Sequence, residues 1–367
     1  MLFKKQLLCI IIALAALHMV PVMSLHVLHL SFHKGCINEI NFIAQQLGFT
    51  VTSLFIPDIL AQEWDGYAQG NALYNVGYER ARCVWQKHKD YFNQFDAIIT
   101  SDTAPLSRIF LQNNYEKPLI IWICNRFDYV DNGSLDCEFP DEHYYQLLRQ
   151  ASTKKNVYLV PYTAFESFYA MQKNVTCDDM VIKPTGFCVH QNVSSAIAAD
   201  VVKENMFFIP PYHNDATVNS VYCCGLINIP VYHGRYNGPH DLKAFKGIIH
   251  IPYAWSNVAF FENIQQGLPY FVPSASFMLD MHRTGMLWWQ NNNFFKNHYQ
   301  LSEWYNPENA EVITYFDSWQ DLKHKIETID FAALRLKVKN FAQDHINAML
   351  DKWRCIFDEI VKNTKEC

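Results

Sequence analysis

The chain has 367 residues, of which 50% are hydrophobic and 18% are charged, and its formal net charge is -6. This composition excludes a disordered or fibrous chain and supplies enough apolar side chains for a large core. The acidic net charge disfavours binding to a phosphate backbone, so we expect no nucleic-acid partner. At about 100–200 residues per domain, the length predicts two domains.

The amino terminus has the pattern of a secretory signal peptide. Lys4 and Lys5 precede an apolar run over residues 7–20, and small residues follow it, which predicts cleavage near Ser24. We therefore expect a protein of the secretory lumen or the cell exterior, or of the periplasm in a bacterium. The apolar run is short for a bilayer span of about 20 residues. The alternative is an uncleaved signal-anchor in the Golgi or endoplasmic reticulum, the one route to a membrane that the sequence offers.

The cysteines and glycosylation sequons fit a secreted glycoprotein. Removal of Cys9 with the signal peptide leaves ten of the eleven cysteines, and some of these should pair in an oxidising compartment. Which ones pair cannot be deduced from sequence. Three sequons predict glycans on surface loops in a eukaryotic source, and they begin at Asn132, Asn174 and Asn192.

Strand-like and helix-like patterns alternate through the chain. Runs of β-branched and aromatic residues predict buried parallel strands at 26–32, 49–56, 96–101, 119–125 and 157–162. After a polar stretch the same pattern returns at 206–212, 227–234, 247–253, 268–274 and 312–316. This alternation predicts an α/β protein with two Rossmann-like domains that face a cleft, without the glycine fingerprint of dinucleotide binding.

We predict four parts from these patterns. They are a signal peptide at 1–24, an N-terminal Rossmann-like domain at 25–190, a C-terminal Rossmann-like domain at 191–345 and a C-terminal helix at 346–367. The aromatic segment 281–306 interrupts the second domain, either as a lid or as a loop packed on its own domain. Two domains of this kind bind ligands at the carboxyl ends of their strands, so candidate site residues should lie there.

Two polar positions follow strands of the first domain. His33 stands at the end of the first strand, where its imidazole could act as a general base or bind a hydroxyl; the alternative is a structural histidine. Ser101, Asp102 and Thr103 follow the third strand, and we expect them to cap the next helix.

In the second domain, the run "YHGRYNGPHDLKAFKG" contains cations close to two loop glycines. Arg235 and Lys246 could bind a diphosphate, because guanidinium and ammonium groups suit its charges. An ordinary solvated charged surface is the alternative.

The segment 247–274 reads as strand, turn, helix and strand. Ser256 or Asn257 should cap the helix and leave its first amides facing an anion. Glu262 lies inside this helix, between stretches that read as buried. A buried carboxylate needs partners, and the vicinal hydroxyls of a ribose could supply them. The alternative is an ordinary exposed glutamate.

The run "PYAWSNVAFFENIQQGLPYFVPS" resembles the donor-site segment of GT-B fold glycosyltransferases. Glu262, Gly267 and Pro269 match the pattern, and the resemblance extends over about residues 205–275. In the retaining members this glutamate binds the ribose of the nucleotide, so the resemblance implies that role for Glu262. Those members carry a second glutamate eight positions earlier, where this chain has Ala254, which leaves the stereochemistry open.

We therefore predict a glycosyltransferase that moves a sugar from a nucleotide-sugar donor to a hydroxyl acceptor on a glycan or glycoprotein. The resemblance implies a hexosyltransferase that works without a bound metal or a cofactor, and the sequence has no Asp-x-Asp. We assign Arg235 and Lys246 to the diphosphate, Ser256 and Asn257 to the helix-start contact, and His33 to the acceptor. A secreted two-domain solute-binding protein, or an inactive relative of the transferases, is the competing hypothesis.

Overall fold

The chain was analysed as a computed structural model that describes residues 25–56, 76–128, 142–187, 195–197, 201, 203–211 and 214–366. The predicted signal peptide and the sequons at Asn132 and Asn192 lie outside the described residues. The third sequon is described: Asn174 is exposed just after α7 (Ala164–Gln172), in a left-handed conformation with φ of 56°.

The first domain is built on a parallel sheet with the strand order β2-β1-β3-β4-β5. Its strands are β1 (His26–Ser31), β2 (Thr50–Phe55), β3 (Ala97–Thr103), β4 (Leu119–Arg126) and β5 (Val157–Pro161). Besides α7, its helices are α2 (Lys34–Leu47), α4 (Tyr78–Phe92), η2 (Ala104–Ser107), α5 (Arg108–Leu111) and α6 (Glu142–Ala151). Leu28 and Leu30 pack on one face, towards α4 and α5, and Val27 and Ile99 pack on the other, towards α2.

The second domain repeats this plan, with the strand order β10-β9-β8-β6-β7 and parallel pairing throughout. Its strands are β6 (Phe207–Ile209), β7 (Val231–His233), β8 (Gly247–Ile249), β9 (Tyr270–Pro273) and β10 (Ile313–Phe316). Its helices are η3 (Lys203–Asn205), α8 (Asn214–Leu226), η4 (Pro239–Asp241), α9 (Val258–Gln265), α10 (Ala275–Arg283), α11 (Trp289–Lys296), η5 (Tyr299–Leu301), η6 (Pro307–Asn309) and α12 (Trp319–Thr328).

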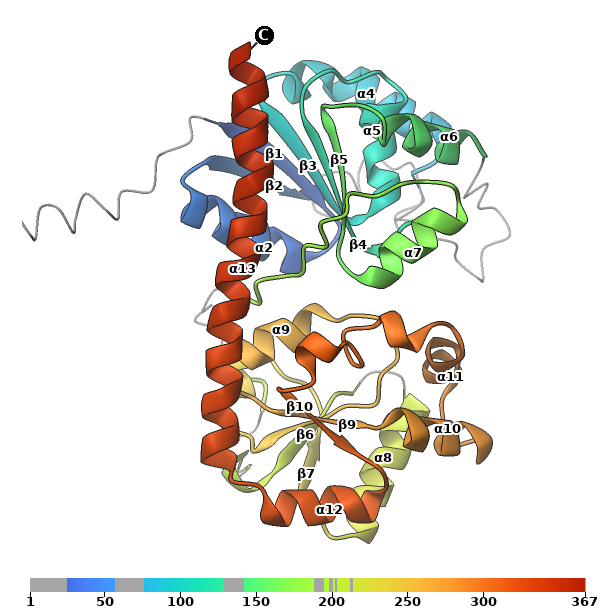
Figure 1. Cartoon of the computed structure of the whole chain (residues 1–367), viewed down its shortest axis with the longest axis vertical. Helices are drawn as coiled ribbons and strands as arrows, with labels where there is room; N and C mark the ends of the chain where they lie inside the picture. Colours follow the sequence, from blue (N-terminus) through green and yellow to red (C-terminus); the bar gives the residue numbers. More distant parts are fainter. Residues whose placement is uncertain are drawn as a thin grey trace, which may run out of the picture.

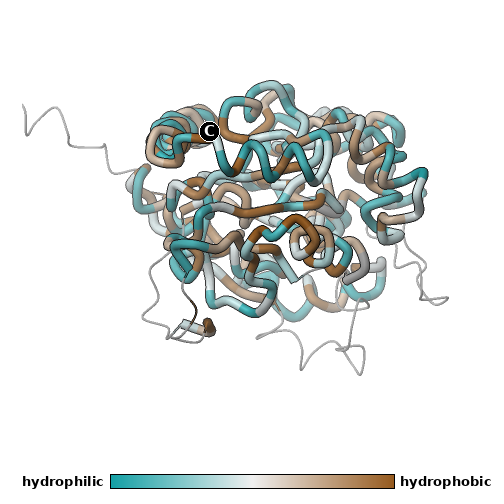
Figure 2. The backbone as a smooth tube through the Cα atoms, turned by 90° about the horizontal axis from the view of Figure 1, so that it is seen from below, coloured by the Kyte–Doolittle hydropathy of each residue, from teal (hydrophilic) through white to brown (hydrophobic). Residues whose placement is uncertain are grey.

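The α/β architecture predicted from the sequence is confirmed. Each of the predicted strand runs overlaps one strand of the two five-stranded sheets. The two sheets lie one above the other along the long axis of the molecule (Figure 1). The strands carry the apolar stretches of the backbone inside each domain, and the more hydrophilic stretches lie outside (Figure 2). Parallel strands read as continuous apolar runs because helices cover both of their faces.

The C-terminal helix is longer than predicted. It is α13 (Phe331–Glu366), so it begins well before residue 346. Its first turn is capped by Asp330, whose Oδ1 accepts hydrogen bonds from the backbone N–H groups of Ala332 and Ala333. The prediction missed this part because most of its side chains are exposed, so the apolar stripe is sparse there.

The helix α13 joins the two domains. Val338 and Ala342 lie in the core of the second domain, whereas Trp353 and Phe357 lie in the core of the first. Figure 1 shows α13 running along both sheets. A boundary at residue 345 therefore falls inside one continuous helix that both domains share.

The aromatic segment 281–306 packs on its own domain. Phe294 and Trp304 are buried in the second core, and the Trp304 indole N–H donates to the carbonyl of Ala254 at 2.8 Å. The lid alternative loses support, because these rings are already covered. The segment also reaches the other domain: the ring centroids of His298 and Phe168 of α7 are 4.5 Å apart. Nearby, the Trp255 ring stacks on Phe165, with ring centroids 3.7 Å apart.

The connector at 182–187 is packed tightly between the two domains. The Glu39 carboxylate of α2 accepts hydrogen bonds from the backbone N–H groups of Thr185 and Gly186, at 2.9 and 2.7 Å. Gly186 has a φ of +78°, and a Cβ atom added there would lie 2.3 Å from the carbonyl oxygen of Phe261 in α9. The backbone of the connector can approach α9 so closely only because residue 186 has no side chain.

We predict that Gly186→Ala destabilises the protein far more than a matched substitution elsewhere. A side chain at positive φ costs about 1–2 kcal/mol, and overpacking against a backbone carbonyl adds about 1–3 kcal/mol. Gly285→Ala is the control, because Gly285 has a φ of +70° but no atom within 4 Å of an added Cβ. Urea unfolding should show a loss of about 3 kcal/mol or more for the first variant and about 1 kcal/mol for the second. Equal losses would contradict the close contact.

Candidate functional site

A cavity of about 190 Å³ lies between the two sheets. We call it the cleft cavity. Its lining from the first domain consists of His33, Cys36, Asp102, Cys124 and Tyr162, and its lining from the second consists of Tyr253, Ala254, Ser256, Asn257 and Val258. These residues lie at or beyond the carboxyl ends of β1, β3, β4, β5 and β8. This is the edge where parallel α/β sheets bind ligands.

The helix α9 begins at the cavity. Asn257 is its N-cap: the side-chain Oδ1 accepts the backbone N–H of Ala259 at 2.9 Å, and Nδ2 donates to the Tyr253 hydroxyl at 3.0 Å. The predicted capping role of Asn257 is confirmed. Ser256 precedes it and lies beside the Tyr162 hydroxyl, but neither oxygen has a hydrogen bond of normal geometry to a described residue. Both are buried hydroxyls that a bound ligand could satisfy.

Glu262 lies one turn inside α9, on the side that faces the first domain. Its side chain is only partly exposed and has no hydrogen bond or ion pair within the described ranges. Burial raises its pKa to about 6, which the charge of nearby His33 opposes and that of Cys36 reinforces. The carboxylate is therefore not solvated on a distant helix face, and no arginine among the described side chains forms an ion pair with it.

His33 is the N-cap of α2. Its Nδ1 accepts the backbone N–H of Gly35 at 3.1 Å, so the neutral ring carries its proton on Nε2. A hydrogen bond with the Cys36 thiol, reinforced by the charges of Asp102 and Glu262, raises the pKa of His33 to about 9 against the effect of burial. Protonation of Nδ1 would break the capping bond, at a cost of about 1 kcal/mol. The neutral ring caps α2, whereas the charged ring, which the raised pKa favours at pH 7, loses this capping bond.

Asp102 is a strained residue in the lining of the cavity. It is buried with a φ of 70°, where the pairing of β3 with β4 shifts register. A non-glycine residue at positive φ costs about 1–2 kcal/mol and persists only where its surroundings hold it. Here the conformation directs the acidic residue to the cleft cavity, within electrostatic range of His33.

Two sequence-based assignments are wrong. Lys246 immediately precedes β8 and so lies at the amino edge of its sheet, opposite the cleft; its Nζ sits 5.7 Å from the centroid of the Phe331 ring. It cannot contact a diphosphate at the carboxyl edge. The capping prediction for 101–103 also fails, because Thr103 precedes η2 without any side-chain capping bond. Arg235 follows β7 at the carboxyl edge, but its side chain is exposed and does not line the cleft cavity.

Sequence reasoning missed three residues of the first domain that line the cavity, which are Cys36, Cys124 and Tyr162, and it assigned a fourth, Asp102, to capping instead. Asp102, Cys124 and Tyr162 stand at or just after the ends of predicted strands, which is the signal that identified His33. Cys36 lies three residues after His33, within one turn of α2, so helical spacing could have linked the two.

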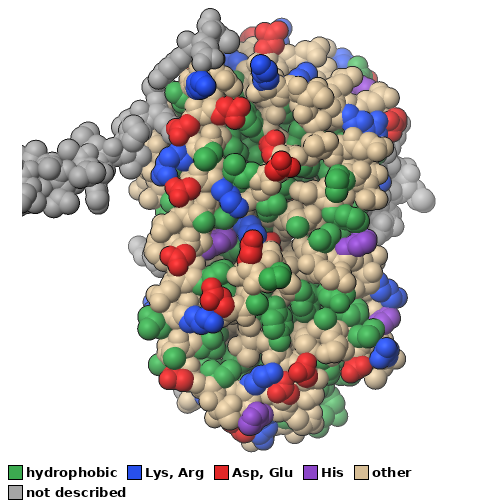
Figure 3. Space-filling model, in the orientation of Figure 1, with side chains coloured by type: hydrophobic (Ala, Val, Ile, Leu, Met, Phe, Trp, Pro, Cys, Tyr) green, Lys and Arg blue, Asp and Glu red, His purple; other side chains and the backbone are tan. Residues whose placement is uncertain are grey.

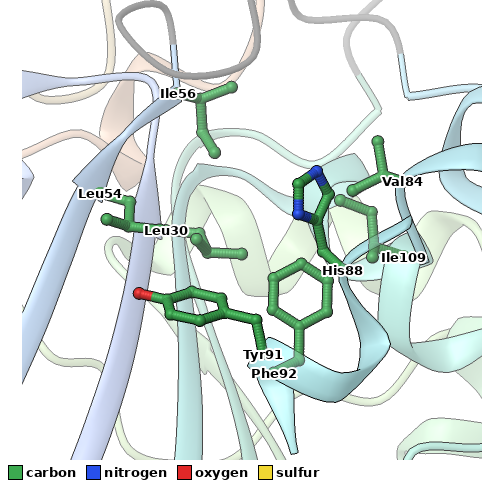
Figure 4. Close-up of a pocket in the computed structure, with 8 residues that line it drawn as sticks. All are labelled: Leu30, Leu54, Ile56, Val84, His88, Tyr91, Phe92 and Ile109. Carbon is green, nitrogen blue, oxygen red and sulfur yellow. The ribbon is translucent and has the colours of Figure 1, made fainter. Parts of the chain in front are cut away.

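A second cavity of about 290 Å³ lies in the first domain, between its sheet and α4. Figure 4 shows Leu30 and Leu54 of the sheet facing Phe92 and Tyr91 of α4, with His88 at one side. Its lining is almost entirely apolar and offers no set of donors for phosphate or ribose. The cleft cavity remains the candidate site, because its polar groups come from both domains.

Three further observations bear on the predicted partners. Within the described ranges, no group of three or more His, Cys, Asp or Glu side chains is placed to hold a metal ion. No helix in this part of the chain has the length and apolar character needed to cross a bilayer. On the face shown in Figure 3, acidic and basic side chains are intermixed and no broad basic patch appears.

No protein-family model matches the chain, and no curated protein matches it in sequence. Several solved structures are similar in fold. The glycosyltransferase SnogD from Streptomyces nogalater aligns at a TM-score of 0.46 and 10% identity, over 91% of this chain and 100% of that chain. HepE from Anabaena, solved in complex with UDP and glucose, aligns at a TM-score of 0.47 and 12% identity, over 91% of this chain and 99% of that chain. MurG from Acinetobacter baumannii aligns at a TM-score of 0.40 and 12% identity, over 89% of this chain and 100% of that chain.

We predict that Glu262 makes the stability of the protein pH-dependent. Because burial raises its pKa from 4.5 to about 6, the folded state holds this proton more tightly than the unfolded chain does. This contribution to stability is fully present below about pH 4.5 and is lost as the pH rises through about 6. It amounts to about 1–2 kcal/mol. Urea unfolding between pH 4 and 7 should show a steeper fall of stability in the wild type than in Glu262→Gln, and the difference isolates Glu262, because the raised pKa values of Glu39 and Asp178 contribute to the slope in both proteins.

Glu116→Gln is the control for this measurement, since Glu116 is an exposed glutamate of the first domain. It should keep the wild-type slope. A Glu262→Gln variant with the same slope as the wild type would show that this carboxyl group is solvated.

Proposed function

We propose that the protein is a glycosyltransferase that moves a sugar from a nucleotide-sugar to a hydroxyl acceptor in the cleft cavity. The observation that carries this proposal is the Glu262 carboxylate, which is largely buried at the domain boundary and has no hydrogen-bond partner within the described ranges. A buried carboxylate is stable when a ligand supplies its donors, and two adjacent ribose hydroxyls supply two. The match of Glu262, Gly267 and Pro269 to the GT-B donor segment points the same way.

The donor would lie against the start of α9. The first turn of this helix faces the cavity, with Ser256, Asn257 and Val258 in the lining. The N–H groups of Ala259 and Phe260 are already bound by Asn257, so it is the positive end of the helix dipole that suits a diphosphate. It would also stabilise the negative charge that develops on the leaving group, which is the main electrostatic task in such a displacement. The orphan Ser256 hydroxyl is a further donor.

The acceptor would lie against the first domain. His33, on the opposite wall, would take the proton of the attacking hydroxyl on Nδ1, because Nε2 of the neutral ring already carries one, and Nδ1 would release the Gly35 N–H as it does so. The charges of Asp102 and Glu262 would stabilise the imidazolium that forms. A base that activates the acceptor directly favours a single displacement with inversion at the anomeric carbon, which a product-linkage assay would test. His33 must be neutral before it can accept this proton.

We further propose that the reaction needs neither a metal nor a cofactor, and that the protein works in the secretory lumen, the periplasm or outside the cell. The start of α9 supports the proposal that no metal is needed, because the positive end of its helix dipole lies where other enzymes use a cation. The proposed location is supported only by the signal-peptide pattern of residues 1–24. Sugar transfer that continues in excess chelator would agree with a reaction that needs no metal.

We predict that a nucleoside diphosphate binds and that Glu262 contributes to its affinity. Isothermal titration with UDP and GDP should detect binding by one of them. Glu262→Ala should weaken it by about 10- to 100-fold, the equivalent of hydrogen bonds to a charged group. Affinity for the wild type should also fall as the pH drops below about 6, where the carboxylate takes up a proton.

Lys246→Ala is the control for the binding experiment, because Lys246 lies at the far edge of the sheet beside Phe331. It should bind the nucleotide as the wild type does. If the folded protein binds no nucleoside diphosphate but does bind a free sugar, the solute-receptor hypothesis replaces the transferase.

We predict that His33→Ala and Asp102→Asn lower the rate of transfer while nucleotide affinity stays near that of the wild type. Loss of a general base lowers the rate of transfer by about 10²- to 10⁴-fold. Loss of the neighbouring Asp102 charge should lower it by less. Turnover is measured in buffer without added reductant. His324→Ala, at an exposed position on α12, is the control and should keep full activity. Full activity in His33→Ala would remove His33 from the mechanism.

A further inference from the structure

Two cysteines lie side by side at the base of the cleft cavity. The Sγ atoms of Cys36 and Cys124 are 3.8 Å apart, and both residues contribute to the cavity lining. They come from different elements, since Cys36 is in the first turn of α2 and Cys124 is near the end of β4. Both thiols are reduced in this structure. Neither has a role in the proposed transfer reaction.

Cys36 has only 1% of its surface exposed, so a small disulfide can reach its sulfur only through the cleft cavity that it lines. Cys36 lies at the amino end of α2, where the helix dipole favours a thiolate, and its neighbour is the capping residue His33. In this structure the Cys36 thiol donates to Cys124 Sγ at 3.8 Å, and the Cys124 thiol donates to the Trp122 carbonyl at 3.5 Å. When Cys36 is a thiolate, hydrogen bonding with Cys124 and with His33 lowers its pKa to about 6, although burial opposes this. Burial keeps the pKa of Cys124 above its usual value, so Cys124 is the partner that stays protonated.

We propose that Cys36 and Cys124 are a redox-active dithiol that reacts with small disulfides entering the cleft, and that its oxidised form is the one in which His33 acts as the base. The second half rests on the proposed glycosyl transfer. The first half stands on the position of the two thiols alone.

The reaction is a thiol–disulfide exchange in two steps. The Cys36 thiolate attacks one sulfur of a small disulfide, which forms a mixed disulfide and releases one thiolate. Cys124 then gives up its proton and attacks the Cys36 sulfur, which releases the second thiol and leaves a Cys36–Cys124 disulfide. The protein loses two electrons and two protons, and the small disulfide gains them. The two sulfurs must move from 3.8 Å to about 2.0 Å apart.

Oxidation changes the surroundings of His33. The ring is faced by Cys36 from its own helix, by Asp102 from the end of β3 and by Glu262 from α9, and the hydrogen bond with Cys36 contributes most to its raised pKa. A disulfide cannot become a thiolate, so the imidazolium loses its main partner. The pKa of His33 then falls towards the ordinary value of 6.5, and more of the ring is neutral at pH 7.

The test uses the full chain equilibrated in cystamine or in cysteamine. Peptide mass analysis should find a Cys36–Cys124 link in the first sample and two free thiols in the second. The imidazole resonance of His33, assigned with a His33→Gln variant, should titrate at lower pH in the oxidised protein. The transfer rate at pH 7 should be about 10- to 100-fold higher after oxidation, because the neutral fraction of His33 rises.

Two variants complete the experiment. Cys36→Ser should form no link and should show the same titration of His33 in both buffers, whereas Cys355→Ser, at an exposed cysteine of α13, should behave as the wild type. Absence of the link in cystamine overturns the dithiol, and a link that leaves the titration of His33 unchanged overturns its coupling to the base. A link with a shifted titration but no sugar transfer would overturn only the glycosyltransferase proposal.

Discussion

The close approach of α9 to α2 and to the connector is the constraint on which the rest of the structure depends. A Cβ atom added at Gly35 in the first turn of α2 would lie 3.2 Å from the Val258 side chain in the first turn of α9. Three residues further along α9, the backbone of Gly186 meets the carbonyl of Phe261. These contacts bring the amino ends of two helices from different domains to one cavity. As a result, polar groups from both domains meet in one small cavity, which neither domain could form by itself.

That shared volume explains why the titratable groups of the cleft perturb one another. Cys36 is fully buried, Glu262 is partly buried and His33 is exposed beside them, and each appears among the causes that shift the pKa of another. Where burial excludes water such interactions are strong, because little solvent screens them. Clusters of this kind are typical of sites that transfer protons or bind charged ligands. A purely structural contact between domains would be expected to use paired or apolar groups instead.

Paired groups do occur at the domain boundary, outside the cleft. Lys183 of the connector forms a buried ion pair with Glu303 at 2.9 Å and a second ion pair with the exposed Glu308 at 2.8 Å. Glu39 accepts its hydrogen bonds from the connector backbone. The helix α13 adds apolar contacts with both cores. The contrast is informative: Lys183 and Glu39 have ion-pair or hydrogen-bond partners in the protein, whereas Glu262 has neither within the described ranges and feels the charges of nearby His33 and Cys36. Glu262 itself is not part of the lining of the cleft cavity.

The sequence by itself determined the strands, their parallel pattern, the two-domain plan and the cap of α9, because apolar periodicity and capping residues are local properties of the chain. It also identified His33 and Glu262, which follow local rules for strand ends and buried charges. Only the tertiary structure decided which side chains meet. Lys246 was assigned by its charge, but a residue that precedes a parallel strand lies at the wrong edge of the sheet. Cys36 and Cys124 are 88 positions apart and become neighbours only when α2 packs on the sheet that contains β4, a long-range contact that no local pattern encodes.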